Sequence, residues 1–96
     1  MLDIKITDSA WLDLVEIGQY TEFRWGKRQR DKYLGDIDEC LYALAEEPGL
    51  GKKRSELRNG CYSYSVGKHV IFYHYNSEIL YVLADLHERM DFERHL

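Results

Sequence analysis

The opening residues of the chain alternate between apolar and polar side chains. Leu2, Ile4 and Ile6 are apolar, and a charged residue lies between each of them and the next. A repeat of two is the period of a β-strand with one buried face. The sequence therefore predicts a short strand here, followed by a helix whose first turn Thr7 or Asp8 can cap with a side-chain oxygen.

Two amphipathic helices are predicted next. In the first, one face is marked at spacings of four, three and four by Ala10, Leu14, Ile17 and Thr21. We expect Gly26 to end this helix, and a second helix to begin at about Lys27 and to stop at Pro48. The apolar stripe of the second helix comprises Tyr33, Leu34, Ile37, Leu41, Leu44 and Ala45. So short a break predicts an αα-hairpin, and we expect Trp25, beside the break, to be a large core residue.

Three segments rich in β-branched and aromatic residues follow the helices. They span residues 61–66, 69–75 and 78–85. Only two residues separate each segment from the next, which predicts an antiparallel meander. Neither helix can bury its stripe alone, so the hairpin must pack on one face of the sheet, in which the first strand can also pair. The sequence thus predicts an α+β fold, one domain over residues 1–96, and a tail at 86–96 that is a short helix or an ordered coil.

Composition and charge restrict the classes of function. The 96 residues carry a formal net charge of −4, with 45% hydrophobic and 31% charged residues, which is an ordinary balance for a soluble domain. Nucleic-acid-binding domains are usually basic, so this acidic chain is not expected to bind nucleic acid over its whole surface. The basic residues gather in two blocks, at 24–32 and 50–60. Such runs are most often solvated surface, although they also suit a local binding patch.

The sequence carries no targeting, membrane or cofactor signal. It has no signal peptide before the first strand and no apolar run of ~20 residues, so we expect a cytoplasmic protein without a membrane partner. Cys40 and Cys61 do not have the spacing of a metal or redox site. We expect both to be reduced thiols, and we predict neither a metal nor a cofactor.

Six blocks of residues carry a resemblance to a known family. They are Tyr20-Thr21 with Trp25-Gly26; Gln29 with Tyr33-Leu34; Leu44-Ala45 with Pro48 and Gly51; Leu57-Arg58 with Gly60; Gly67 with His69 and Ile71-Phe72-Tyr73; and Leu86-His87 with Arg89-Met90-Asp91 and Arg94-His95. In this order and spacing they resemble the ParE-type toxins of the ParE/RelE superfamily, from type II toxin–antitoxin modules. The resemblance covers nearly the whole chain and implies the RelE/ParE-like fold.

The resemblance also implies a function. ParE-like members are known as poisons of DNA gyrase with no established catalytic residues, and RelE-like members resemble ribosome-dependent mRNA endoribonucleases. We therefore expect a growth-inhibiting toxin of a plasmid-stabilising type of module, which inhibits DNA gyrase by protein–protein binding and is not an enzyme. A ParD-like antitoxin, with a DNA-binding N-terminal region and a disordered C-terminal segment, is expected to neutralise it. DNA would then be contacted only indirectly, through the antitoxin.

The ribonuclease remains the alternative. RNA cleavage by attack of the 2′-hydroxyl needs a base, an acid and cations that stabilise charge on the phosphate. The predicted strands at 61–75 contain no arginine. Where many ParE relatives read Arg-Ile-Leu-His, this chain reads Ala84-Asp85-Leu86-His87, and a carboxylate at that place is expected to repel a phosphate. Arg58 and His87 are the pair that could still supply a phosphate contact and an acid or base.

Two sets of polar residues are candidates for partner contacts. The target-binding candidates, in the closing motif, are His87, Arg89, Asp91 and Arg94. In the competing interpretation, Arg89 and Asp91 form a structural pair while Met90 and Phe92 dock the tail on the sheet. The antitoxin-binding candidates are Arg24, Lys27, Arg28 and Arg30, because cations there can meet acidic antitoxin residues while apolar residues of the hairpin anchor the segment.

Overall fold

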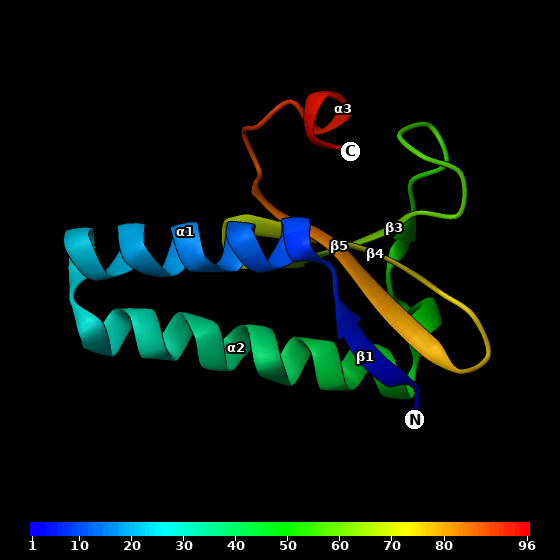
Figure 1. Ribbon diagram of the computed structural model, residues 1–96, viewed down its shortest axis with the longest axis horizontal. Coiled ribbons are helices and arrows are strands. Elements are labelled where there is room, and N and C mark those ends of the chain that lie inside the picture. The colour runs from blue at the N-terminus through cyan, green and yellow to red at the C-terminus, as the bar shows by residue number, and fades with distance from the viewer.

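A five-stranded sheet is covered by a helical hairpin on one face and by the C-terminal tail on the other (Figure 1). The computed structural model describes all 96 residues. In chain order the elements are β1 (Asp3–Ile6), α1 (Asp8–Trp25), α2 (Lys27–Glu46), the 3₁₀ turn η1 (Pro48–Leu50), β2 (Lys52–Lys53), β3 (Tyr62–Val66), β4 (His69–Tyr75), β5 (Ile79–His87) and α3 (Phe92–His95). The α+β architecture predicted from the sequence is confirmed.

The strands lie in the order β1-β5-β4-β3-β2. The predicted antiparallel meander is β3-β4-β5, and β1 joins the same sheet as the one parallel strand, beside β5. Sequence patterns missed the two-residue strand β2, which pairs with β3. They also ended the last strand at residue 85, whereas β5 continues to His87. His87 therefore belongs to the sheet and not to the tail.

The ends of the helices follow the local sequence signals. Thr7 caps α1, because its Oγ1 accepts the N–H of Ala10 at 3.2 Å. The same hydroxyl donates to the carbonyl oxygen of Val82 at 2.9 Å, which ties the start of α1 to β5. Gly26, at φ 95°, ends α1 and leads directly into α2. A residue with a Cβ rarely adopts that φ, so glycine is what makes this tight hairpin possible.

The expectation that Trp25 is a core residue was wrong, because its side chain is 66% exposed. The hairpin extends beyond the edge of the sheet (Figure 1), and Trp25 lies at its far end. No second layer covers the helices there. The guanidinium of Arg24 lies over the indole ring, 5.3 Å from the centroid, so the ring is partly shielded by its neighbour and not by the core.

The core consists of one apolar cluster on each face of the sheet. The cluster under the hairpin contains Ala10, Ile37, Leu41, Leu44, Ile71, Tyr73, Leu80 and Val82. The cluster on the tail side contains Cys61, Val70, Phe72, Ala84 and Leu86, with Leu57, Phe92 and Leu96 packed against it. Both clusters draw on β4, because alternate residues of a strand point to opposite faces. Both cysteines are free thiols, as predicted.

An irregularity in β5 decides which side chains face the hairpin. The register of β4 against β5 shifts between Phe72 and Tyr73, which leaves Leu83 without a partner. An extra residue of this kind is a β-bulge, and it re-aims the side chains around it. Ala84 consequently packs in the tail-side cluster, whereas Asp85 points toward the hairpin and the hydroxyl of Tyr33.

Candidate binding surfaces

An apolar groove runs between α1 and α2 on the side of β1. This hairpin groove has a volume of about 520 Å³, and seven of its thirteen lining residues are hydrophobic. Trp11 and Val15 form part of its wall and are 58% and 41% exposed. Gly18 lies in this groove, and a Cβ there would be in ordinary contact with Leu34 Cδ1, at 3.8 Å. Exposed apolar surface that is rimmed by charged residues is typical of a protein–protein contact.

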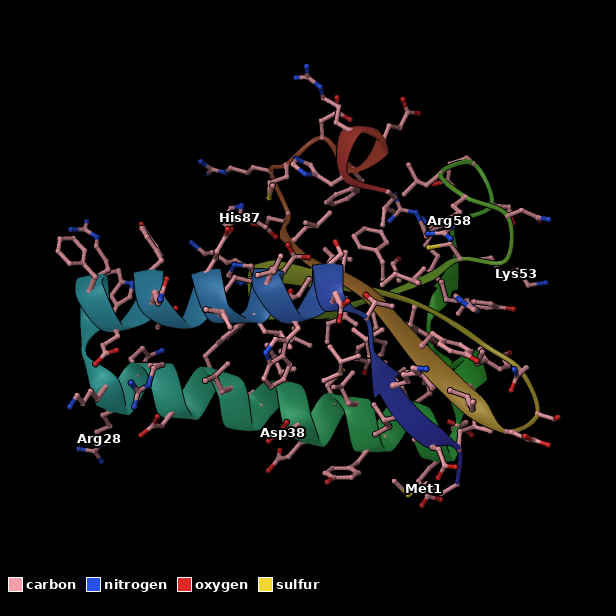
Figure 2. The ribbon with its side chains drawn as sticks, viewed as in Figure 1. Met1, Arg28, Asp38, Lys53, Arg58 and His87 are labelled. Atoms are coloured by element: carbon pink, nitrogen blue, oxygen red, sulfur yellow. The ribbon has the colours of Figure 1, made fainter.

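The four antitoxin-binding candidates differ in how they are engaged. Arg30, on the rim of the hairpin groove, pairs with Glu22 at 3.0 Å and with Asp31 at 2.9 Å. Arg24 is stacked on Trp25. Lys27 and Arg28 are exposed at the start of α2, and neither forms an ion pair within the chain. Figure 2 shows Arg28 projecting from the tip of the hairpin. The tip therefore presents two cations that are free to meet an acidic partner.

A second groove, the histidine groove, lies between the hairpin and the ends of β4 and β5. Its volume is about 610 Å³, and its lining includes Trp25 and Tyr33 from the helices, Lys68 from the β3–β4 turn, and His69 and His87 from the strands. The two imidazole rings meet edge to face, with centroids 5.3 Å apart. The ring of Tyr33 also lies against His69, with centroids 5.0 Å apart. Burial lowers the pKa of His69, and nearby His87 lowers it further, so His69 is a neutral imidazole at pH 7.

Asp85 lies under this region and is only 2% exposed. Its Oδ2 accepts a hydrogen bond from the Tyr33 hydroxyl at 3.3 Å, while its buried Oδ1 has no partner. Burial raises the pKa of Asp85 to about 7, against the opposing effect of the Tyr33 hydrogen bond, and the carboxylate of Asp13 raises it further. The expectation that the Asp85 carboxylate repels a phosphate assumed an exposed side chain, whereas the β5 bulge turns this side chain into the core.

The target-binding candidates lie on the surface at the end of β5 and in the tail. Arg89, Asp91 and Arg94 are exposed and form no ion pair, so the structural pair between Arg89 and Asp91 is absent. His87 is half-buried, and its Nδ1 accepts the backbone N–H of Arg89 at 3.1 Å. Phe92 does dock the tail, through an edge contact with Phe72. The three exposed residues are therefore presented to solvent by an anchored segment.

The two residues of the alternative nuclease pair lie in different surroundings. Arg58 is an exposed residue of the loop between β2 and β3, where its carbonyl oxygen accepts the N–H of Cys61 at 3.1 Å. His87 lines the histidine groove, and Arg58 is not among the residues of that groove. Figure 2 likewise shows Arg58 in the β2–β3 loop and His87 above α1. The basic residues that line this groove with the two imidazoles are instead Lys32 and Lys68, the latter beside His69 in the chain.

The chain lacks two further features that would point to other classes of function. No three His, Cys, Asp or Glu side chains are grouped so that they could hold a metal ion. None of the helices combines the length and the apolar character that crossing a membrane requires.

Sequence reasoning missed the two grooves, although each had a signal. The hairpin groove is marked on α1 by a second stripe, at Trp11, Val15 and Gly18, next to the stripe that faces the sheet. The signal for the histidine groove is the register of β4 against β5, which places His69 opposite His87. The register depends on a bulge, so the second signal could be recognised only after the fold was known.

Two open grooves and an exposed polar tail, on a hairpin packed against a sheet, are typical of a small protein that binds other proteins. Residues 4–92 match the family described as the ParE toxin of the type II toxin-antitoxin system, parDE. The chain is 34% identical over 92 residues to Toxin ParE1 of Mycobacterium tuberculosis (strain H37Rv), covering 95% of this chain and 94% of the relative. It is 31% identical over 96 residues to Toxin ParE1 of Caulobacter vibrioides, covering 100% and 99%. The chain therefore belongs to the ParE toxin family of type II toxin–antitoxin systems.

A solved structure agrees with this assignment at the level of the fold. It is described as the chromosomal ParDE TA system from P. aeruginosa, and the superposition has a TM-score of 0.77. The match covers 91% of this chain and 96% of that chain, with 19% sequence identity. At that identity the comparison establishes a common fold.

Proposed function

We propose that this toxin inhibits DNA gyrase by protein–protein binding and that a ParD-like antitoxin neutralises it. The choice of gyrase follows from membership of the ParE family. The observation that supports neutralisation by a bound antitoxin is the uncovered apolar wall of the hairpin groove, where Trp11 is 58% exposed. Burying such surface is the main favourable term in protein association, so the groove is better suited to holding a partner than to facing water.

The antitoxin is assigned to the hairpin groove. A flexible segment with apolar residues can place them against Trp11 and Val15, while its acidic residues meet Lys27 and Arg28 at the tip. Folding of a disordered segment on such a surface lets it wrap a wide area at the cost of ordering the chain. Arg30 contributes less in this arrangement, because its guanidinium is already engaged by Glu22 and Asp31.

The target is assigned to the tail and the end of β5. His87, Arg89, Asp91 and Arg94 lie there, with the last three exposed. Arginine offers several donors in a fixed fork and can bind a carboxylate with two hydrogen bonds. Because the tail packs on the face of the sheet opposite the hairpin, the proposal gives antitoxin and target different primary contacts.

A supercoiling and DNA-cleavage assay with purified gyrase tests the target. We expect the toxin to inhibit supercoiling and to increase the fraction of cleaved DNA held by gyrase. A translation assay with intact mRNA runs beside it. If gyrase activity is unchanged at saturating toxin, gyrase is not the target.

Cleavage of mRNA is the second candidate, and one observation favours it. His69 and His87 stand edge to face in a groove that also holds Lys68, and His69 is neutral at pH 7 because burial lowers its pKa. A neutral imidazole can act as a general base. If mRNA were cut in the translation assay, His69→Ala should abolish the cleavage without changing binding of the antitoxin.

A further inference from the structure

The last six residues of the tail, 91–96, form no hydrogen bond to the body of the protein, whereas the start of the tail is fixed by the backbone N–H of Glu88, which donates to the carbonyl of Lys68 at 2.9 Å. Within residues 91–96 the backbone bonds run from the N–H of Arg94 to the carbonyl of Asp91, and from the N–H of Leu96 to that of Phe92. No side chain of this segment donates to or accepts from another part of the chain. The direction in which this segment presents Asp91 and Arg94 therefore depends on how Phe92 and Leu96 are packed.

Arg54 forms one wall of the Phe92 site. The ring of Phe92 meets Phe72 with centroids 4.8 Å apart. The guanidinium of Arg54 lies over both rings, 5.5 Å from the centroid of Phe92 and 5.8 Å from that of Phe72. A cation over an aromatic face is attracted by the ring, and more strongly where water is partly excluded. The side chain of Arg54 is 19% exposed, so it meets that condition.

The guanidinium is itself fixed by other contacts. Its Nε donates to Glu56 at 2.8 Å, and Nη1 donates to the hydroxyl of Ser63 at 3.3 Å. The backbone N–H of Arg54 donates to the carbonyl of Cys61 at 2.8 Å, which closes the β2–β3 loop. Figure 1 shows this loop beside α3. Arg54 thus links the loop and β3 with Phe92 of the tail. Its planar guanidinium can donate hydrogen bonds at its edge while its face lies over an aromatic ring, which the ammonium group of a lysine cannot do.

We propose that Arg54 is a positioning residue for target binding, which clamps Phe92 and so holds Asp91 and Arg94 in the arrangement that the target recognises. Arg54 does not touch the target. The inference rests on the proposed assignment of the target to the tail. The hairpin groove lies on the other face of the sheet, so loss of the clamp leaves the antitoxin contact unchanged.

The test compares Arg54→Met with Arg58→Met, a matched control in the same loop whose side chain is exposed and forms no ion pair. We expect amide exchange in the tail to become about five- to tenfold faster in Arg54→Met, as loss of two such stacking contacts implies. Growth inhibition should weaken by about tenfold or more, and antitoxin affinity should stay within about twofold. Arg58→Met should match the wild type in tail exchange.

Two results would overturn the proposal. One is unchanged tail exchange in Arg54→Met, and the other is a loosened tail with full toxicity. If Arg54→Met also loses antitoxin binding, Phe92→Leu decides, because it leaves Arg54 and its loop intact: it must loosen the tail and weaken toxicity, and a fully toxic variant rejects the clamp. Growth inhibition does not presuppose gyrase. If the wild-type toxin arrests growth but leaves gyrase unaffected, the proposed target is rejected. The comparison of tail amide exchange and growth inhibition between Arg54→Met and the wild type still tests the clamp in that case.

Discussion

The carboxylate of Asp13, on α1, accepts a hydrogen bond from the backbone N–H of Asp85 at 3.1 Å. This N–H lies two residues after Leu83, the unpaired residue of the β5 bulge. A bulge disrupts the ladder around it, and here a helix side chain supplies the acceptor. The contact joins the hairpin to the sheet at the place where β5 turns Asp85 toward the core.

Replacing Asp13 should show the value of this contact. Asp13→Ala leaves a buried N–H without an acceptor, and we expect the free energy of unfolding to fall by about 1–3 kcal/mol. Asp13→Asn keeps a carbonyl oxygen in the same place and should recover most of the loss. Denaturant unfolding monitored by tryptophan fluorescence gives both values. Equal losses in the two variants would mean that the charge of Asp13, and not its role as acceptor, stabilises the fold.

The buried carboxyl of Asp85 predicts a pH dependence of stability. Its pKa is raised from 3.8 to about 7 on folding, so the folded state retains a proton that the unfolded state has released between about pH 4 and pH 7. The contribution of Asp85 to the free energy of unfolding is then complete below pH 4 and falls as the pH rises through this window. The total loss is roughly 4 kcal/mol at most, and it levels off above pH 7. Burial also raises the pKa of Asp13, which acts in the same direction.

Asp85→Asn should remove most of this slope. The amide has nearly the shape of the protonated carboxyl and does not titrate, so the unfolding free energy of the variant should lose the contribution of Asp85 to the slope between pH 4 and pH 7 and keep that of Asp13. The comparison is made by denaturant titration at each pH. If the variant retained the full slope of unfolding free energy against pH, the titrating group would be a residue other than Asp85.

Trp25→Ala is expected to leave the melting temperature within about 2 °C of the wild type, because substitutions of exposed side chains rarely change stability by more than ~0.5 kcal/mol. The indole is 66% exposed at the end of the hairpin. Phe72→Ala is the contrasting variant, since Phe72 is fully buried and its loss should cost about 3–5 kcal/mol. Thermal unfolding followed by circular dichroism measures both. A large destabilisation by Trp25→Ala would show that the ring is covered.

The contrast between Trp25 and the helix stripes shows what the sequence could predict. The periods of two and 3.6 located β1, both helices and the meander, since they report which face of an element is buried. Gly26 and Thr7 marked helix ends through their own backbone and side-chain chemistry. Nothing in these patterns reports whether a second layer covers the end of a helix, and Trp25 was therefore assigned to the core.

The candidate site was less predictable for a related reason. The sequence identified exposed polar residues of the tail and the basic hairpin tip, because charged side chains are rarely buried. It could not reveal the bulge at Leu83, which buries Asp85 and sets the register that brings His69 beside His87. Both effects depend on how two strands pair, and the pairing is decided by the whole sheet.

The hairpin groove can be tested by a charge in its apolar wall. Val15→Asp should weaken antitoxin binding by about thirtyfold or more, as expected when a central apolar contact is lost. Leu12→Asp is the matched control, because Leu12 is 63% exposed on the same helix and does not line the groove. Titration calorimetry with the antitoxin measures the affinity. Equal effects of the two substitutions on the affinity would mean that the antitoxin does not bind in the hairpin groove.

The tail residues should affect function and not folding. Arg89→Ala and Arg94→Ala remove exposed side chains without ion pairs, so each should leave the free energy of unfolding within ~0.5 kcal/mol. Both should abolish growth inhibition, and antitoxin affinity should be retained. Variants that are folded and fully toxic would place the target contact elsewhere, with the basic tip at Lys27 and Arg28 as the next surface to test.

A DNA-cleavage assay with purified gyrase decides whether gyrase is the target of this toxin. Wild-type toxin is titrated into gyrase and supercoiled DNA, with Arg89→Ala as the folded comparison, and cleaved DNA is measured after denaturation of the enzyme. We expect cleaved DNA to accumulate with increasing wild-type toxin and to stay at the background level with the variant. The proposal would be contradicted if gyrase cleaved and supercoiled DNA normally at saturating wild-type toxin, while the same toxin arrested growth or cut mRNA.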